Sequence, residues 1–324
     1  MVFGWFWMVF GWFLDGFWTV HNGSRDGPSW PMTLSCEGEL GELGPPTKKI
    51  LQVDQVDDNA PWRTARLTDW DVVNRMYMQN KTPSPLFNAP WVKVRIFRRD
   101  WLHASDQGVA VDFAGNCLEL LCTTFPAATI KARVQELFDD ICAWYDREGV
   151  PHSCRLPCLT QGMIQSQGKA PKLRANAGTV RAIIPYLREA TLVRLNGGHV
   201  LHAAVQQAAT DLAECYDALR NDNIFHVLVL QRHSRLFALQ YVALSNAHVG
   251  TKNWKLKPKL HLWLELCLEG GRPACFWTYR DEDYGGGVAR MAHRRGARAS
   301  VAALSVQVLE SFRVKQPILR IGVS

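Results

Sequence analysis

Two polar stretches that lie far apart in the sequence contain the residues best suited to chemistry. The first stretch, residues 99–109, places Asp100, His103 and Asp106 between two apolar segments. A carboxylate at the end of a strand and beside the start of a helix is well placed to bind a divalent metal ion. A structural interpretation, which the spacing alone favours, makes Asp106 the N-cap of the next helix, Asp100 a loop residue and His103 a buried side chain.

The second stretch, residues 255–287, joins a basic segment to a run of three acids. Its basic part contains Lys257, Lys259 and His261, and its acidic part is Asp281–Asp283. Three adjacent carboxylates repel one another, so they need a cation, basic neighbours or full contact with water. A metal site and a solvated turn at the start of a helix account for this run equally well.

A cluster of basic side chains follows the acidic run. It consists of Arg290, His293, Arg294, Arg295 and Arg298. These side chains can contact nucleic-acid phosphates, in which case binding weakens as the salt concentration rises. They can equally form a solvated helix face that neutralises the acids before them. A second, looser basic stretch is better explained as solvated surface; it consists of Lys169, Lys172, Arg174 and Arg181.

Hydrophobic periodicity predicts a mainly α chain with a small α/β part. We expect a short strand over residues 91–97 and a long loop over residues 151–176. The expected helices span residues 67–78, 109–124, 130–147, 177–190, 199–220, 224–244, 259–268 and 289–312. Pro185 should bend or end its helix. The 224–244 segment is apolar nearly all round, which predicts that it is the buried central helix.

The first 60 residues differ in character from the rest of the chain. Residues 1–18 form a decaying seven-residue repeat rich in Phe, Trp and Gly, and residues 19–60 show no sustained period. We expect a low-complexity, disordered lead-in that is followed by one domain over residues 61–324. The alternative for residues 1–18 is a membrane or interfacial anchor, although Asp15 interrupts a run that is short for a spanning helix.

The composition sets broad limits on function. The chain has 324 residues, of which 47% are hydrophobic and 21% charged, with a formal net charge of +7, so we expect a globular protein with a basic surface. Nine cysteines without a CxxC pair indicate mostly buried thiols in a reducing compartment. His152, Cys154 and Cys158 could hold zinc, but no fourth ligand lies nearby. No Walker A or Rossmann glycine motif is present, so we expect no nucleotide or other small-molecule cofactor.

The two polar stretches resemble two sequence blocks of DDE-type DNA transposases. Residues 100–109 read D-x-L-H-x-x-D-x-G-V, which is similar to a block of the CACTA-like and Plavaka-like families. Residues 257–261 read K-P-K-L-H, and with the later T-x-R-D-E stretch they are similar to a second block of those families. The match covers residues 81–122 and 252–296, and the ordered pair is more specific than either block alone.

The resemblance implies a fold, a reaction and a partner. The fold would be the C-terminal remnant of an RNase H-like core, interrupted by a helical insertion over residues 125–250. In transposases of this kind, a triad of carboxylates holds two Mg²⁺ ions that cleave and transfer DNA strands. DNA would be the partner, Mg²⁺ the cofactor and the nucleus the location.

The resemblance also assigns roles to individual residues. It makes Asp100 the second metal-binding carboxylate, with Asp106 as a competing candidate, and His103 the histidine that supports the site. The third acidic residue and its alternatives are Glu282, Asp281 and Asp283. Near the DNA backbone or the site, the resemblance places Lys257, Lys259 and His261.

The chain departs from the family at the first catalytic aspartate. The acids upstream of residue 100 include Asp54, Asp57 and Asp58, which lie in a polar stretch without a clear buried strand. We therefore expect that the first carboxylate and the N-terminal half of the catalytic domain are missing, and that DNA cleavage is lost. The alternatives are a non-enzymatic DNA-binding or helical interaction protein, and a helical scaffold with a membrane-facing N-terminus.

Overall fold

The structure is a computed structural model that describes residues 99–220, 225–275 and 277–279, together with Val56, Gly286, Arg290, Val306 and Glu310. The chain divides into two compact units. The larger unit is Pro28–Trp277, and the smaller one combines Met1–Gly27 with Thr278–Ser324. The predicted helix 67–78 and strand 91–97 lie outside the described residues, as do most residues of the predicted helix 289–312.

The described part of the larger unit is built from helices. In chain order they are η4 (Leu102–Val109), α3 (Ala110–Cys122), α4 (Ile130–Arg147), η5 (His152–Cys154), α5 (Gln161–Ile164), α6 (Ala177–Arg194), α7 (Val200–Arg220), α8 (Val227–Ala247), α9 (Pro258–Leu268) and η6 (Pro273–Cys275). No strand occurs among the described residues. The prediction of a mainly α chain is therefore confirmed for this part. No helix in it is long and apolar enough to cross a membrane.

The helix boundaries agree well with the hydrophobic periodicity. Helix α4 has the predicted limits, and its N-cap residue Thr129 accepts a hydrogen bond from Ala132 N at 3.2 Å. Helix α9 begins with Pro258, whose missing N–H costs nothing in the first turn. The predicted loop 151–176 contains two short helical turns, η5 and α5.

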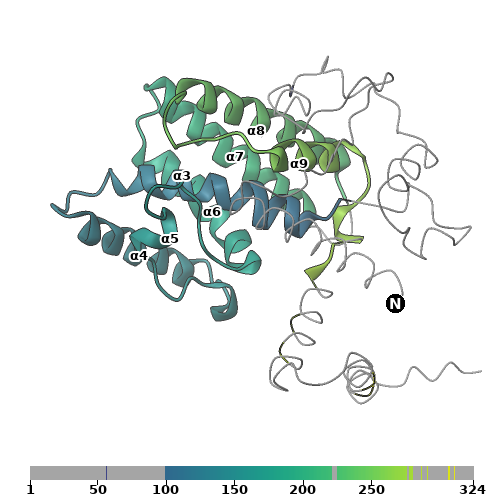
Figure 1. The fold of residues 1–324 in the computed structure, drawn as a ribbon, viewed down its shortest axis with the longest axis horizontal. Coiled ribbons are helices and arrows are strands. Elements are labelled where there is room, and N and C mark those ends of the chain that lie inside the picture. The colour runs from purple at the N-terminus through teal and green to yellow at the C-terminus, as the bar shows by residue number, and fades with distance from the viewer. Residues whose placement is uncertain are drawn as a thin grey trace, which may run out of the picture. The chain divides into compact units, whose positions relative to one another are not determined.

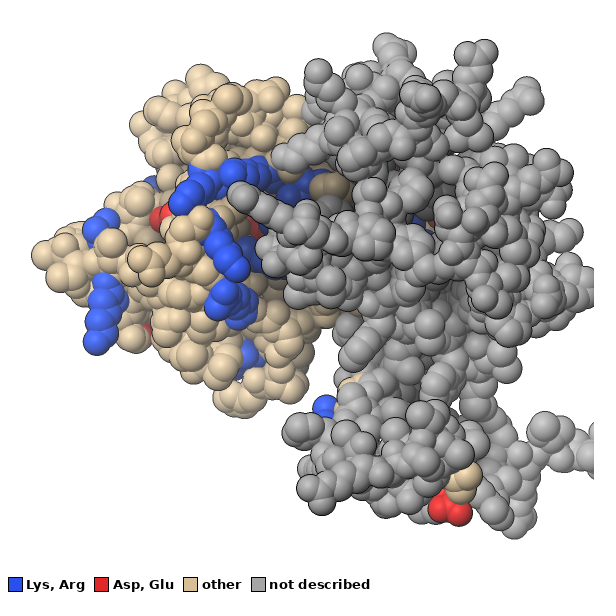
Figure 2. Space-filling model, in the orientation of Figure 1, with Lys and Arg blue, Asp and Glu red and all other residues tan. Residues whose placement is uncertain are grey.

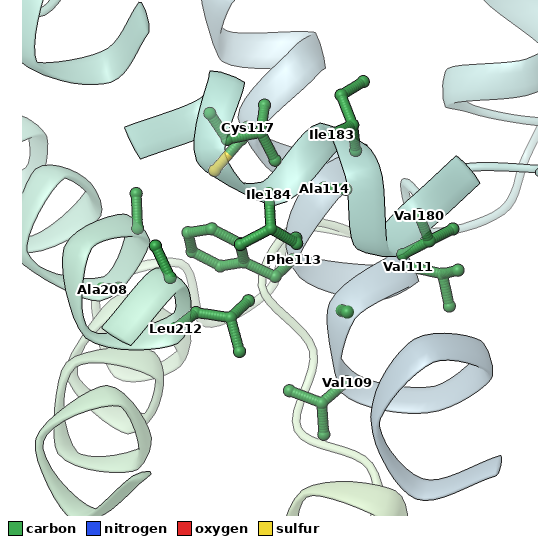
Figure 3. Packing of buried hydrophobic residues seen from close by; sticks show 14 of the residues in the cluster. Val109, Val111, Phe113, Ala114, Cys117, Val180, Ile183, Ile184, Ala208 and Leu212 are labelled. Atoms are coloured by element: carbon green, nitrogen blue, oxygen red, sulfur yellow. The ribbon is translucent and has the colours of Figure 1, made fainter. Parts of the chain in front are cut away.

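The continuous helix η4–α3 is the centre of the larger unit. Figure 1 shows α7 and α8 side by side on one side of α3, with α4 and α5 on the other. Phe113 of α3 is fully buried, and Figure 3 shows it between Ile184 of α6 and Leu212 of α7. Its ring also lies 5.3 Å from that of Phe237 in α8. Helices from distant parts of the sequence therefore share one core around α3.

The prediction that residues 224–244 form the central helix is wrong. Helix α8 buries one face, which includes Leu230, Phe237 and Leu244, and packs mainly on α7. On its other side Leu228 is 75% exposed and Leu239 is 44% exposed. The apolar composition of this segment was a poor guide, because burial depends on which faces the neighbouring helices cover.

Of the two effects expected of Pro185, a bend or an end of its helix, the end does not occur, since α6 continues to Arg194. A proline inside a helix removes one backbone hydrogen bond and costs about 3 kcal/mol. The residues on either side of Pro185 are buried; Ile183, Ile184 and Leu187 belong to the core, and the Tyr186 ring packs on that of Trp144 in α4. Their burial offsets the cost of the proline and keeps the segment helical.

Most described thiols are not fully buried, contrary to expectation. Cys117, Cys215 and Cys267 are buried, whereas the other described cysteines are at least partly accessible. All of those described are free thiols.

Candidate functional site

The first motif lies at the start of a helix, and Asp100 is the residue that caps it. Asp100 Oδ2 accepts a hydrogen bond from His103 N at 3.0 Å and lies 2.6 Å from His103 Nδ1. The interpretation of Asp106 as the N-cap is therefore wrong, because the helix begins before it. His103 is not fully buried either, because its side chain is 23% exposed. An acceptor at the N-cap satisfies one of the free backbone donors of the first turn.

Asp106 is held inside the helical unit. Its Oδ1 accepts a hydrogen bond from Trp101 Nε1 at 3.2 Å and another from the hydroxyl of Tyr216. Asp106 is fully buried, and Ser105 Oγ lies 3.1 Å from the same Tyr216 oxygen. A buried carboxylate needs such donors, because desolvation otherwise disfavours its charge strongly. This arrangement favours a structural role for Asp106.

Tyr216 is a site residue that the sequence analysis did not single out. It comes from α7 and lies 110 residues from Asp106 in the sequence. Its ring meets the ring of Trp101 edge to face at a centroid distance of 5.6 Å. The only sequence signal was its position four residues after Leu212, on the buried stripe of an amphipathic helix.

The motif segment has π-helical rather than α-helical geometry over Leu102–Val109. Wide turns of this kind are rare and occur frequently at functional sites. Gly108 lies near the end of this π-helical segment. A Cβ atom at Gly108 would be 2.8 Å from His103 O and 3.0 Å from Lys259 Cδ. The glycine of the D-x-G-V pattern therefore allows another segment to approach the helix closely.

The segment that approaches Gly108 is the K-P-K-L-H motif at the start of α9. Helix α9 packs on η4, and Lys259 Nζ lies 3.4 Å from Gln107 O. Lys257 Nζ forms an ion pair of 2.7 Å with Asp112 Oδ1 in α3. The structure thus brings residues of both motifs together.

His261, the histidine of the K-P-K-L-H motif, lies beside a different carboxylate. His261 Nε2 lies 3.6 Å from Glu265 Oε1, one turn along α9. Glu265 also pairs with Arg99 at 2.5 Å. His261 therefore lies beside an ion pair that connects α9 to the residue before Asp100.

Several predicted site residues lie outside the described part of the chain. They are Asp281, Glu282, Asp283, Arg294, Arg295 and Arg298, and likewise the upstream Asp54, Asp57 and Asp58. Arg290 is described as an exposed helical residue of the smaller unit.

A metal site needs several donor side chains that converge on one point. No three His, Cys, Asp or Glu residues in the described ranges come together as possible metal ligands. His152, Cys154 and Cys158 belong to those ranges, and Cys158 Sγ instead lies 3.8 Å from Met163 Sδ. The zinc alternative for this segment consequently has no support in the arrangement of its side chains.

A cavity of about 300 Å³ lies between α3, α7, α8 and the connection before α9. Its lining includes three histidines, His199, His202 and His248. Glu119 also lines it and accepts a hydrogen bond from Asn253 Nδ2 at 2.7 Å. Burial raises the pKa of the Glu119 carboxyl above its usual 4.5, although the bond from Asn253 opposes this shift.

Comparisons of the chain with protein-family models, with curated proteins and with solved structures find no match. The transposase resemblance therefore depends on the two sequence motifs alone.

Proposed function

We propose that this protein derives from a DDE-type DNA transposase, binds DNA and does not cleave it. The observation that carries the proposal is the contact between the two motif segments. Lys259 Nζ of the second motif lies 3.4 Å from Gln107 O of the first, which is 152 residues away in the sequence, and Lys257 forms an ion pair with Asp112 just after the first motif. A catalytic domain of this class must bring such remote segments to one place, because both help to build one site.

The surroundings of the candidate carboxylates support the loss of cleavage. Asp106 is fully buried and accepts hydrogen bonds from two side chains, whereas Mg²⁺ usually keeps several waters and binds carboxylates that face solvent. Asp100 is engaged by the first turn of its helix and by His103. Upstream of Asp100 no residue of the sequence stands out as the first carboxylate of a triad.

Incubation of the purified protein with labelled duplex DNA ends and Mg²⁺ or Mn²⁺ tests the proposal. We expect the wild type to bind the DNA and leave both strands intact. Cleavage that requires the metal and is lost in both Glu282→Ala and Asp100→Asn would show an active enzyme and overturn the second half of the proposal. Failure of the wild type to bind duplex DNA at low salt would overturn the first half.

A further inference from the structure

A basic loop of the larger unit lies directly on α3. The loop comprises residues 169–174, and its backbone passes so close to Gly115 that a Cβ there would be 2.6 Å from Lys172 Cα. Leu173 N donates a hydrogen bond of 2.9 Å to Val111 O in the same helix. The loop is therefore fixed both to the central helix and to α5, where Ile164 O and Met163 O each accept a hydrogen bond of 2.8 Å, from Lys172 N and Arg174 N.

A second basic segment, residues 252–259, is fixed to the same helix. Trp254 N donates a hydrogen bond of 2.8 Å to Asn116 Oδ1, and Lys257 pairs with Asp112. Trp254 adopts a φ of +52°, a backbone conformation that is uncommon for a bulky side chain. The hydrogen bond that Trp254 N donates to Asn116 and the burial of the Trp254 ring hold the segment in this conformation.

The two segments form one basic surface. We use this name for Lys169, Lys172, Arg174, Lys252, Lys255, Lys257 and Lys259. The segments approach one another at Gly168, where a Cβ would lie 4.0 Å from Lys252 Nζ. In the view of Figure 1 the connection before α9 crosses in front of α7, and in Figure 2 this area carries a run of Lys and Arg side chains.

The charge of the basic surface is only partly balanced. Lys257 is paired with Asp112. Within the described ranges no carboxylate pairs with four of its exposed members, which are Lys169, Arg174, Lys252 and Lys255. Exposed cations that lie close together attract a polyanion, because its negative charge neutralises theirs.

We infer that the basic surface binds the phosphate backbone of double-stranded DNA without reading its base sequence. This inference rests on the proposed function and names the surface that carries out the DNA binding. Lysine, which predominates here, is a flexible point charge that suits phosphates better than base edges. None of the exposed large hydrophobic residues in the described part lies within either segment, so the surface lacks the apolar side chains that insert into a lipid interface.

Two double variants of the full-length chain test the inference. One is Lys169→Ala with Arg174→Ala, and the other is Lys252→Ala with Lys255→Ala. The matched control is Lys131→Ala with Arg232→Ala, an exposed pair on α4 and α8 that lies outside both segments. Affinity for a random-sequence duplex is measured between about 50 and about 200 mM salt, and thermal melting checks that each variant folds.

Each double variant should lower the slope of log affinity against log salt by about 2, and the combined quadruple variant by about 4. The quadruple variant should bind roughly 100-fold more weakly at low salt, while the control keeps the wild-type slope. If both double variants keep the wild-type affinity and salt slope, the inference is overturned and the proposed function still stands. The same holds if only one of the two segments affects DNA affinity. Equal competition by polyglutamate would overturn it in favour of an acidic protein partner. If the wild type binds no duplex at all, the inference and the DNA-binding part of the proposed function both fail.

Discussion

Asp106 is a carboxylate enclosed by the helices of the larger unit, and its hydrogen-bond donors decide whether it can remain charged there. Trp101 comes from its own helix, whereas Tyr216 comes from α7. The hydroxyl of Tyr216 also lies 3.1 Å from Ser105 Oγ, so one phenol connects two polar side chains of the motif to a second helix. Removing a donor from a buried charge leaves that charge desolvated, which costs more than an ordinary hydrogen bond contributes.

We predict that Tyr216→Phe destabilises the protein by about 1–3 kcal/mol, because Asp106 loses a donor while the ring contacts are kept. Denaturant unfolding measures this change. Tyr145→Phe is the matched control, since Tyr145 is equally buried but its hydroxyl makes only a long contact of 3.5 Å with Leu156 N. Equal losses in the two variants would show that the bond to Asp106 contributes nothing particular to stability.

At the scale of elements, the loop of residues 169–174 keeps its place because α3 presents a glycine to it. Gly115 lies on the face of α3 where the backbone at Lys172 and Leu173 passes. A glycine inside a helix usually weakens it by about 1 kcal/mol relative to alanine. Here the close approach of the loop accounts for the glycine, since any Cβ would occupy the space of the loop backbone.

Gly115→Ala should therefore destabilise the protein by about 1–3 kcal/mol, despite the higher helix propensity of alanine. Gly162→Ala in α5 is the control, because a Cβ at Gly162 meets no atom within 4 Å. We expect that control to be neutral or slightly stabilising in thermal melts. A Gly115→Ala variant as stable as the wild type would mean that the loop moves away from α3 without cost.

At the scale of the whole molecule, the cavity beside Glu119 links folding to pH. Several helices and the connection before α9 meet there, so the environment of Glu119 exists only when the larger unit is folded. Its carboxyl has a raised pKa in the folded chain because of burial. The folded state thus binds this proton more tightly than the unfolded state, and the resulting stability is present below pH 4.5 and lost as pH rises through the raised pKa.

We predict that Glu119→Gln becomes more stable relative to the wild type as pH rises from about 4.5 to about 7, because glutamine never carries the buried charge. Glutamine keeps an oxygen that can accept the bond from Asn253. Thermal melts of both proteins across this range measure the difference. A constant difference between Glu119→Gln and the wild type would contradict the assignment of the raised pKa to Glu119.

The sequence by itself determined most of the helices. Residues 130–147 and 200–220 show a clear apolar stripe, and the periodicity of such a stripe is a local property that survives in any fold. The sequence also marked residues 100–109 and 257–261 as unusual polar segments. It did not reveal that Asp100 rather than Asp106 caps the helix, because that depends on the residue at which the helix begins.

Tertiary structure decided the centre of the core and the partners of the motif. Helix α3 is central and α8 is not, although the residues of both helices are largely apolar, because burial is set by the faces that neighbouring helices cover. Likewise, Tyr216 joins Asp106 and Lys257 joins Asp112 only after chain segments more than a hundred residues apart have packed together. Such pairings leave no periodic trace in a single sequence, since each depends on the relative placement of two whole helices.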